Sequence, residues 1–396
     1  GAQILFVAFG ATVLVPLLTG LNPSLALLGA GIGTLIFQVC TRREVPIYLG
    51  SSFAFIAPVI YSVQTWGMPA TLGALSAASF FYYVAAGLVK WRGVNFIHRL
   101  LPPVVIGPVV MVIGLGLAQV AVSMATGKAG DQQVVPYGTA LSVAAVSLLA
   151  TMLTAIRARR LLKLVPILVG VAVGYAYSLF LGIVDFSKVT NAAWLAIPEF
   201  GKPEFNMAAI LFMIPVAIAP IVEHVGGILA IGSVTGKDFT ESPGLHRTLF
   251  GDGLAVNVVG LFGGPPVTTY GEVTGAVMLT KNYNPVVMTW AACFAILMAF
   301  VGKFGAFLQT IPMPVMGGIM VLLFGSIAGI GLKTIVEGRV DLASARNLCI
   351  VSVTLVVGIG GLGVTIGSFS LQGISLCGVL AVLLNLLLPR EPESTH

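Results

Sequence analysis

Charge is what this sequence has least of. Only 9% of its 396 residues are Asp, Glu, Lys or Arg, whereas soluble domains carry roughly 25%. Hydrophobic residues make up 57% of the chain, and the mean hydropathy is +1.03. Apolar runs close to the ~20 residues that cross a bilayer recur along its length. The composition therefore excludes a soluble protein and predicts an all-α polytopic membrane protein whose solvent is the lipid bilayer.

Cysteine and reactive motifs are also scarce. The four cysteines lie in apolar stretches without CxxC spacing, which argues against a disulfide framework or a metal site. The apolar runs hold neither an HExxH motif nor a nucleophile beside a base, so an enzyme, a metal and a cofactor are not expected. The net charge of +6 follows the membrane and predicts no nucleic-acid partner. Because Gly1 enters an apolar run directly, no cleavable signal peptide is expected and the first helix looks truncated.

Glycine and proline, by contrast, are abundant, with 48 and 22 copies. Both are tolerated in membrane helices, where they allow close packing or deliberate breaks, and irregular backbone at depth occurs only where it is buried in protein or lines a cavity. This favours a transporter or channel over an anchor. Charge, Pro and Gly divide the chain into fourteen predicted spans, near residues 1–18, 22–41, 46–63, 70–89, 100–125, 137–156, 161–183, 207–233, 248–263, 267–280, 285–302, 312–332, 346–364 and 371–388. The third and tenth are short and broken.

The basic residues predict the orientation of these spans. Cytoplasmic loops of membrane proteins are enriched in Lys and Arg. If the N-terminus is inside, 16 of the 20 basic residues fall on inner connections. Only Lys128, Lys188, Lys202 and Lys303 then remain outside. Both termini are therefore predicted to be cytoplasmic.

An internal repeat accompanies this count. Pro103-Val-Val-Ile-Gly107, followed by Gly114, has the spacing of Pro314-Val-Met-Gly-Gly318, followed by Gly325. These segments open the fifth and twelfth spans, and the two broken spans are likewise seven apart. Because seven is odd, the second half would lie upside down relative to the first. That is the inverted repeat of secondary transporters, which bind their substrates near the bilayer midplane.

Two acidic residues are the main candidates for chemistry. Glu223 lies in the middle of the eighth span and Glu272 in the broken tenth, and neither has a basic residue within one helical turn. A carboxylate at membrane depth is costly to ionise, so it can bind a proton and donate a hydrogen bond. That suits proton coupling and the recognition of a polar, neutral ligand. Alternatively, either Glu caps a broken helix or satisfies backbone amides.

The broken segments themselves are a second candidate feature. Residues 50–55 and 270–275 could present free backbone groups and positive helix N-termini at the midplane, where a flat ligand with alternating donors and acceptors could be read. Phe53, Phe55 and Tyr270 could stack on a planar ring. The alternatives are ordinary helix kinks and core packing.

Two further titratable residues are given structural roles. His224 follows Glu223 directly, so on a helix it points about 100° away from it. It is expected to pack between helices rather than to relay protons. Asp252 stands at the start of the ninth predicted span and is expected to be an N-cap or loop residue.

Several motifs together resemble a known family. They are Phe9-Gly-Ala-Thr-Val-Leu-Val-Pro16, Tyr48-Leu-Gly-Ser-Ser-Phe-Ala-Phe-Ile56, Val222-Glu-His-Val-Gly226, Pro243-Gly-Leu-His-Arg247, Thr268-Thr-Tyr-Gly-Glu272 and Ile311-Pro-Met-Pro-Val-Met-Gly-Gly318. Over essentially the whole chain the sequence is similar to the nucleobase-ascorbate (nucleobase:cation symporter-2) family, and closest to its bacterial uracil permeases.

The resemblance implies an architecture and a location. It implies a 7+7 inverted repeat with a core domain (1–95 and 207–306; spans 1–4 and 8–11) and a gate domain (96–206 and 307–396; spans 5–7 and 12–14, with a short cytoplasmic tail). Short strands in spans 3 and 10 would frame the site. Members of the family are commonly dimeric, so a homodimer in the bacterial cytoplasmic (inner) membrane is expected.

The resemblance also implies a function, proton-coupled uptake of uracil by alternating access. Carried over by position, Glu223 and Glu272 would hydrogen-bond the pyrimidine and serve proton coupling. Phe53 and Gly271 would contribute backbone groups, and Tyr270 would line the pocket. Purine and xanthine members typically carry an amide pattern in place of the acid at the tenth span. Glu272 therefore favours uracil over xanthine.

The sequence departs from the family at three places. Uracil permeases of this type resemble Glu-His-Val-Gly-His at the eighth span, where the last His assists proton coupling, but position 227 here is Gly. Val273 stands where the family often has Asn, and Pro265-Pro266 precedes the tenth-span motif. With Gly at position 227, Glu223 itself or a water would take the role of the relay histidine, and the changes around the tenth-span motif would shift the ligand preference.

Other carriers and a channel remain alternatives. A purine or xanthine permease of the same family and a sulfate-type anion carrier on the same fold are both compatible with the span pattern. An anion carrier should offer a basic residue or an acid-free half-helix terminus at the midplane, whereas this chain places two carboxylates there. A channel is less easily set aside, although paired inverted repeats with broken helices are the layout of alternating access.

Overall fold

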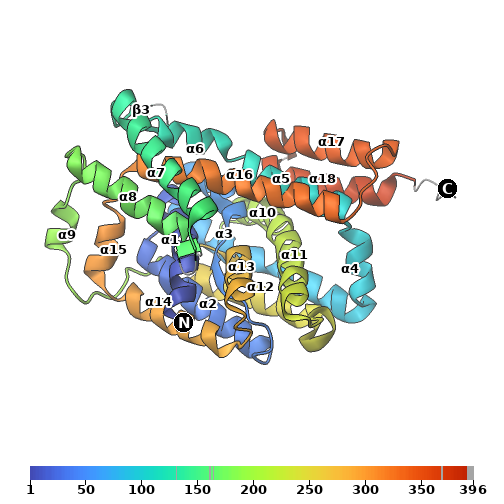
Figure 1. The fold of residues 1–396 in the computed structure, drawn as a ribbon. Helices are drawn as coiled ribbons and strands as arrows, with labels where there is room; N and C mark the ends of the chain where they lie inside the picture. Colours follow the sequence, from blue (N-terminus) through green and yellow to red (C-terminus); the bar gives the residue numbers. More distant parts are fainter. Residues whose placement is uncertain (131, 160–161, 164, 367–368, 390–396) are drawn as a thin grey trace.

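The computed structural model describes residues 1–130, 132–159, 162–163, 165–366 and 369–389 (Figure 1). Residues 161 and 164 of the seventh predicted span, and the predicted tail from 390 onward, lie outside these residues. The described chain is mostly helical, with three two-stranded sheets. In its first half the elements are α1 (Ala2–Thr19), α2 (Pro23–Cys40), β1 (Leu49–Ser51), η1 (Phe53–Phe55), α3 (Ile56–Arg92), α4 (Val94–Leu100), α5 (Pro103–Leu115), α6 (Ala118–Ala125), β2 (Lys128–Ala129), β3 (Gln132–Gln133), α7 (Tyr137–Arg157), α8 (Pro166–Phe180) and α9 (Ser187–Asn191).

The second half repeats this mixture of long helices and short strands. Its elements are α10 (Met207–Met213), η3 (Ile214–Ala217), α11 (Ile218–Thr235), η4 (Thr240–Gly244), α12 (Leu245–Leu261), β4 (Val267–Thr269), α13 (Gly271–Thr280), α14 (Val286–Ala299), α15 (Gly302–Leu308), α16 (Met313–Glu337), α17 (Ala345–Ile359), β5 (Gly363–Ile366), β6 (Phe369–Gln372) and α18 (Gly373–Leu387).

Local sequence signals set several helix ends. Gly20 adopts a left-handed conformation (φ 75°) and ends α1. Two residues later the Asn22 side chain accepts a hydrogen bond from the Ser24 amide at 2.8 Å, and Pro23 fills the first helical position of α2. The five consecutive residues from Gly20 to Ser24 therefore determine the turn between α1 and α2.

Seven helical segments of the described chain are long and apolar enough to cross a membrane: Ala2–Thr19, Pro23–Cys40, Phe53–Arg92, Pro103–Ala125, Tyr137–Arg157, Met207–Thr235 and Met313–Glu337. Four further apolar helices are shorter: Pro166–Phe180, Val286–Ala299, Ala345–Ile359 and Leu376–Leu387. Large apolar side chains such as Phe180 and Ile156 are mostly exposed. Such a surface suits contact with lipid.

Some predicted spans are interrupted. The predicted helix over 100–125 is two helices, because α5 ends at Leu115 and α6 begins at Ala118. The predicted helix over 207–233 changes to a 3-10 turn between α10 and α11, where Pro215 has no backbone N–H to donate. Helix α3 is broken at Gly67 (φ 83°), within the gap between two predicted spans.

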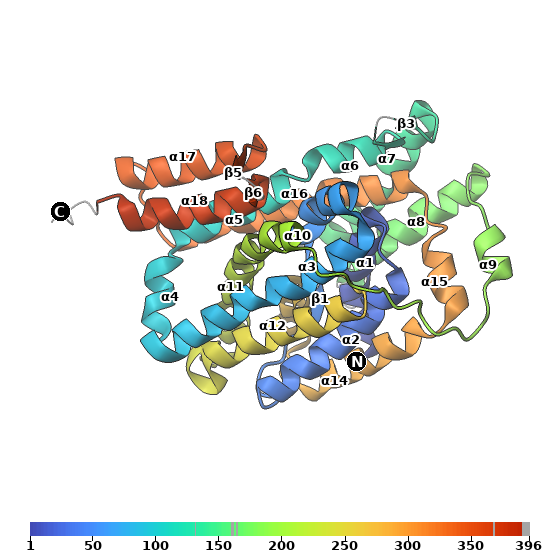
Figure 2. The same cartoon turned by 180° about the vertical axis from the view of Figure 1, so that it is seen from behind.

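The helices pack in two groups (Figures 1 and 2). In one group α12 lies on α2 and α3, and α14 lies on α1 and α2. In the other, α16 packs against α5, α6 and α7, and α17 packs against α5 and α18. Helix α11 lies between the groups, since it contacts α12 and α13 as well as α5 and α18.

Helices α5 and α16, which open with the two repeated Pro and Gly motifs, meet along a line of glycines. A Cβ placed on Gly331 would lie 2.5 Å from the Gly107 carbonyl oxygen, and one on Gly107 would lie 2.9 Å from the Gly331 carbonyl oxygen. A Cβ on Gly114 would lie 2.8 Å from the Ala328 amide nitrogen. The two backbones are therefore in direct contact, as in other membrane helix pairs with small interfacial residues. We call this contact the α5–α16 seam.

Candidate functional site

The two segments that the sequence marks as broken lie side by side. Strands β1 and β4 pair antiparallel, with Leu49 opposite Thr269 and Ser51 opposite Val267. Two more backbone bonds extend the ladder, from the Ser52 amide to the Pro266 carbonyl at 2.8 Å and from the Tyr270 amide to the Tyr48 carbonyl at 3.1 Å. We call residues 48–52 and 266–270 together the strand pair.

Neighbouring helices hold the strand pair through hydroxyl groups. The Leu49 amide donates to Thr34 Oγ1 on α2 at 3.0 Å, and Ser51 Oγ donates to the Thr12 carbonyl on α1 at 2.9 Å. Tyr270 Oη donates to the Ser51 carbonyl at 2.8 Å. The Tyr270 ring therefore lies across Gly50, where a Cβ would collide with it. Only glycine fits beneath that ring.

Helix α13 begins where β4 ends. Tyr270 is extended (φ −93°, ψ 119°), and its side chain does not cap the helix. Gly271, the first residue of α13, is exposed, and a Cβ on it would meet no atom within 4 Å. Glu272 is the next residue of this helix. The positive end of the α13 dipole therefore lies directly after the strand pair.

One face of α11 lies against β4. Glu223 is half-buried, and Gly227 lies one turn further along the same face. A Cβ on Gly227 would lie 3.0 Å from Thr269 Oγ1, whereas one on Gly226 would meet nothing within 4 Å. Position 227, which departs from the family pattern, is thus a point where α11 packs tightly on β4. A side chain there would require the Thr269 side chain to shift.

Five buried hydroxyl groups on the strand pair and α13 have no hydrogen-bond partner among the described residues. They belong to Tyr48, Ser52, Thr268, Thr269 and Thr274. A buried hydroxyl left without a partner costs about 1–3 kcal/mol. Such a concentration is expected where a polar ligand or water completes the bonding.

The predicted site residues occupy the ends of the strand pair and the neighbouring α11. Phe53 begins the 3-10 turn after β1, and its ring stands edge-on to Phe324 of α16, with centroids 6.1 Å apart. Tyr270, Gly271 and Glu272 follow β4, and Glu223 faces the site from α11. The structure brings these positions into one region, while their individual roles stay predictions.

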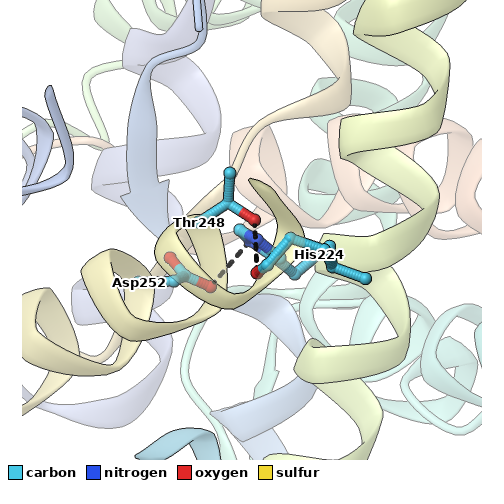
Figure 3. A network of polar contacts seen from close by, with 4 residues as sticks. His224, Thr248 and Asp252 are labelled. Carbon is cyan, nitrogen blue, oxygen red and sulfur yellow. Dashed lines mark hydrogen bonds and ion pairs between the residues drawn. The ribbon is translucent and has the colours of Figure 1, made fainter. Parts of the chain in front are cut away.

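The interpretation of Asp252 as an N-cap or loop residue is wrong. It is the eighth residue of α12 and is fully buried, with its Oδ2 3.1 Å from Nδ1 of His224 (Figure 3). His224 packs between helices as expected, with Phe37 edge-on to its ring. The error came from starting the helix at residue 248 instead of Leu245. An acid flanked by Gly251 and Gly253 inside an apolar span was the signal that could have corrected it.

The sequence of this chain is similar to those of known transporters. The profile described as the Permease family (Xan_ur_permease) matches residues 1–367. The probable uracil permease of Pasteurella multocida (strain Pm70) is 57% identical over 394 residues, covering 100% of this chain and 94% of that protein. The uracil permease of Bacillus caldolyticus is 46% identical over 402 residues, covering 100% and 92%. The uracil permease of Escherichia coli (strain K12) is 41% identical over 385 residues, covering 97% and 89%.

Solved structures show the same fold at low sequence identity. The transmembrane domain of the cyanobacterial bicarbonate transporter BicA superimposes with a TM-score of 0.65 at 15% identity, covering 97% of this chain and 95% of that domain. SLC26A9 gives a TM-score of 0.69 at 14% identity, and the match covers 98% of this chain and 64% of SLC26A9. The likeness establishes a mostly helical, transporter-type membrane fold.

Proposed function

The chain belongs to the Permease family, the nucleobase-ascorbate transporters, and on that premise we propose that it carries uracil across the membrane together with protons. Its relatives are named as permeases, so it is a transporter and not an enzyme, in agreement with the sequence prediction. The family and the apolar helices also make it a multi-pass membrane protein.

The observation that carries the choice of ligand is the set of unpaired hydroxyls around the strand pair. Uracil is a flat, neutral ring with two N–H donors and two carbonyl acceptors on its edge. Backbone groups at Phe53 and Gly271, the amides that open α13, and the Glu223 and Glu272 carboxyls offer both donors and acceptors to such an edge. A neutral ligand also suits the site that we propose, because Glu223 and Glu272 would repel an anion and no cationic side chain is assigned to it.

Proton coupling is assigned to Glu223 and Glu272. When protonated, either carboxyl can donate a hydrogen bond to a uracil carbonyl. When ionised, it can only accept. Uracil binding from outside is therefore favoured by protonation of one acid, and release inside follows its deprotonation. The half-buried setting of Glu223 beside β4 supports this assignment.

The architecture that we propose is fourteen spans in a 7+7 inverted repeat, with short strands in spans 3 and 10. Two observations support it: the strand pair and the α5–α16 seam each join segments that correspond in the sequence repeat. The two helix groups support a core (1–95 and 207–306) and a gate (96–206 and 307–396) that move against each other as rigid bodies. We further propose cytoplasmic termini, a bacterial inner-membrane location and a homodimer.

The test is uptake of radiolabelled uracil into proteoliposomes with and without an inward proton gradient. Unlabelled thymine, xanthine and sulfate serve as competitors, and empty liposomes as the control. Gradient-driven uptake that only uracil-like pyrimidines block supports the proposal. Uptake indifferent to the gradient overturns the coupling. Competition by xanthine or sulfate alone moves the substrate to a purine or an anion.

A further inference from the structure

A fully buried His–Asp pair lies beside the proposed site but takes no part in it. His224 Nδ1 on α11 and Asp252 Oδ2 on α12 are 3.1 Å apart, and both side chains are 0% exposed (Figure 3). A second ion pair, between Lys333 and Glu337, lies at the surface, and each of those side chains is 67% exposed. The His224–Asp252 pair is thus shut off from solvent, whereas the Lys333–Glu337 pair is not.

Stability does not explain this pair. Replacing a buried ion pair by apolar residues of similar volume is often neutral or stabilising, because desolvation offsets the attraction. Here His224 Nε2 and Asp252 Oδ1 have no hydrogen-bond partner within the described residues, and the alignment at the close approach falls short of a hydrogen bond. Ionisable residues inside membrane helices usually mark a pathway for protons or ions.

A buried tyrosine packs beside the pair. Tyr82 on α3 is fully buried, and its hydroxyl has no hydrogen-bond partner in the described structure. It packs against the residue that follows Asp252, because residue 253 is glycine: a Cβ there would lie 2.5 Å from Tyr82 Cβ.

Other titratable groups of the described chain lie near the pair. Helix α2 offers the thiol of Cys40, which packs against Gly251, α3 offers Tyr83, whose ring lies beside Gly253, and α11 itself offers Glu223. Phe37, also on α2, is apolar and stands edge-on to His224. Gly227, on the Glu223 face of α11, has no side chain to titrate. The Tyr82 hydroxyl is a buried hydroxyl without a partner in the described structure that α3 brings to this part of α12.

We propose that the His224–Asp252 pair is a proton reservoir for Glu223, reached through the Tyr82 hydroxyl, and that it positions the transported proton without touching the substrate. This inference rests on the proposed proton-coupled uracil transport. A proton leaving protonated Glu223 turns it into a carboxylate. The same proton converts the imidazole–carboxylate pair, with net charge −1, into an imidazolium–carboxylate pair with net charge zero. The buried charge is conserved, so the transfer avoids a second unpaired ion.

The test compares net proton-driven uptake with uracil exchange in proteoliposomes. Asp252→Asn and His224→Gln remove the titration and keep similar shapes. The matched control is Thr248→Val, one turn before Asp252 on α12, because the Thr248 hydroxyl is fully buried and bonds only its own helix at the Leu245 carbonyl (Figure 3). Lumenal pH, read with an entrapped dye, reports protons moved per uracil.

We expect Asp252→Asn and His224→Gln to bind uracil and exchange it within about twofold of the wild type. Gradient-driven accumulation should fall at least about tenfold, and lumenal acidification per uracil should fall with it. Thr248→Val should keep both. Unchanged accumulation and acidification in both variants overturn the inference. So does a parallel loss of binding, exchange and accumulation, which would mark a structural role.

Tyr82→Phe decides the question if the pair variants do not fold. It leaves the pair in place and removes only the connecting hydroxyl, so driven accumulation should fall while exchange persists. Unaltered coupling in Tyr82→Phe overturns the pathway. Failure of the proposed function itself would be seen separately, as absence of uracil uptake by the wild type.

Discussion

The strand pair and the α5–α16 seam each bring together segments that correspond in the sequence repeat, yet they are built in opposite ways. At the seam, glycines on both helices let the backbones touch, and a side chain at these positions would collide with the facing helix. At the strand pair, five buried hydroxyls have no partner among the described residues, and Gly271 opens onto free space.

The seam is therefore a packing contact, whereas the strand pair offers polar groups that a ligand can bind. A membrane helix pair without polar groups is stabilised by close packing, so it can act as a rigid joint. Irregular backbone at membrane depth must be buried or line a cavity, so it can offer groups to a ligand. Substitutions at the seam should therefore change stability, and those at the strand pair should change binding.

The largest effect is expected at the chemical contact. Glu272→Gln should lower uracil affinity by about 10- to 100-fold, because a charge-assisted hydrogen bond is worth about 1.5–3 kcal/mol and each 1.4 kcal/mol is tenfold. Equilibrium binding of radiolabelled uracil to the purified protein measures this. Glu337→Gln, on the exposed side of α16, is the control. A normal affinity in Glu272→Gln would remove Glu272 from the site.

The next effect should appear at the seam. Gly331→Ala places a methyl group against the Gly107 carbonyl, and overpacking of this kind costs about 1–3 kcal/mol. The apparent Tm in detergent should fall while uracil affinity stays near normal. Gly329→Ala, two residues earlier on α16, would meet no atom within 4 Å and should leave Tm unchanged. Equal Tm values for the two variants would contradict direct backbone contact.

Tyr270→Phe should change both stability and uracil binding, each to a smaller extent than the two substitutions above. It removes the hydrogen bond to the Ser51 carbonyl, which costs about 1 kcal/mol of stability. It should also weaken binding several-fold, by loosening the strand pair. Thermal unfolding and uracil binding are measured on the same sample, with Tyr137→Phe on the surface as control. A lower Tm with normal affinity would separate the strand pair from the ligand.

The smallest effect is expected where α11 meets β4. Gly227→Ala should weaken binding about two- to fivefold, because its Cβ would lie 3.0 Å from Thr269 Oγ1 and that side chain must shift. Gly226→Ala, which meets nothing within 4 Å, is the control. Adding Thr269→Ala should restore part of the affinity, and a double-mutant cycle measures the coupling. Additive losses would show that the two positions act independently.

Sequence reasoning located most helices because their ends are local events. Asn22-Pro23 opens α2 and Pro312 precedes α16, and both ends agree with the predicted spans to within one residue. The break between α5 and α6 was missed, since Gly114-Leu115-Gly116-Leu117 reads like the rest of an apolar run. Small residues fit a straight helix and a broken one equally well.

The strand pair was harder to foresee than its parts. Glycines and prolines marked both segments as broken, but the register that places Leu49 opposite Thr269 depends on Thr34 and Thr12, which lie on other helices. The unpaired hydroxyls gave no signal in the sequence. In membrane helices most Thr side chains bond their own backbone, as Thr12 Oγ1 does to the Ala8 carbonyl.

The antiparallel ladder between Ser51 and Val267 joins points more than 200 residues apart, and this has a consequence for biosynthesis. At about 5–20 residues per second, a ribosome needs roughly 10–40 s to make the intervening chain. During that interval β1 has no partner strand. The groups that hold it in the finished protein, the Thr34 hydroxyl and the Thr12 carbonyl, lie on α1 and α2 and are made before it, so these two helices are available as a scaffold for the first half of the site. The binding region is therefore completed late in translation, when the second half of the chain enters the bilayer.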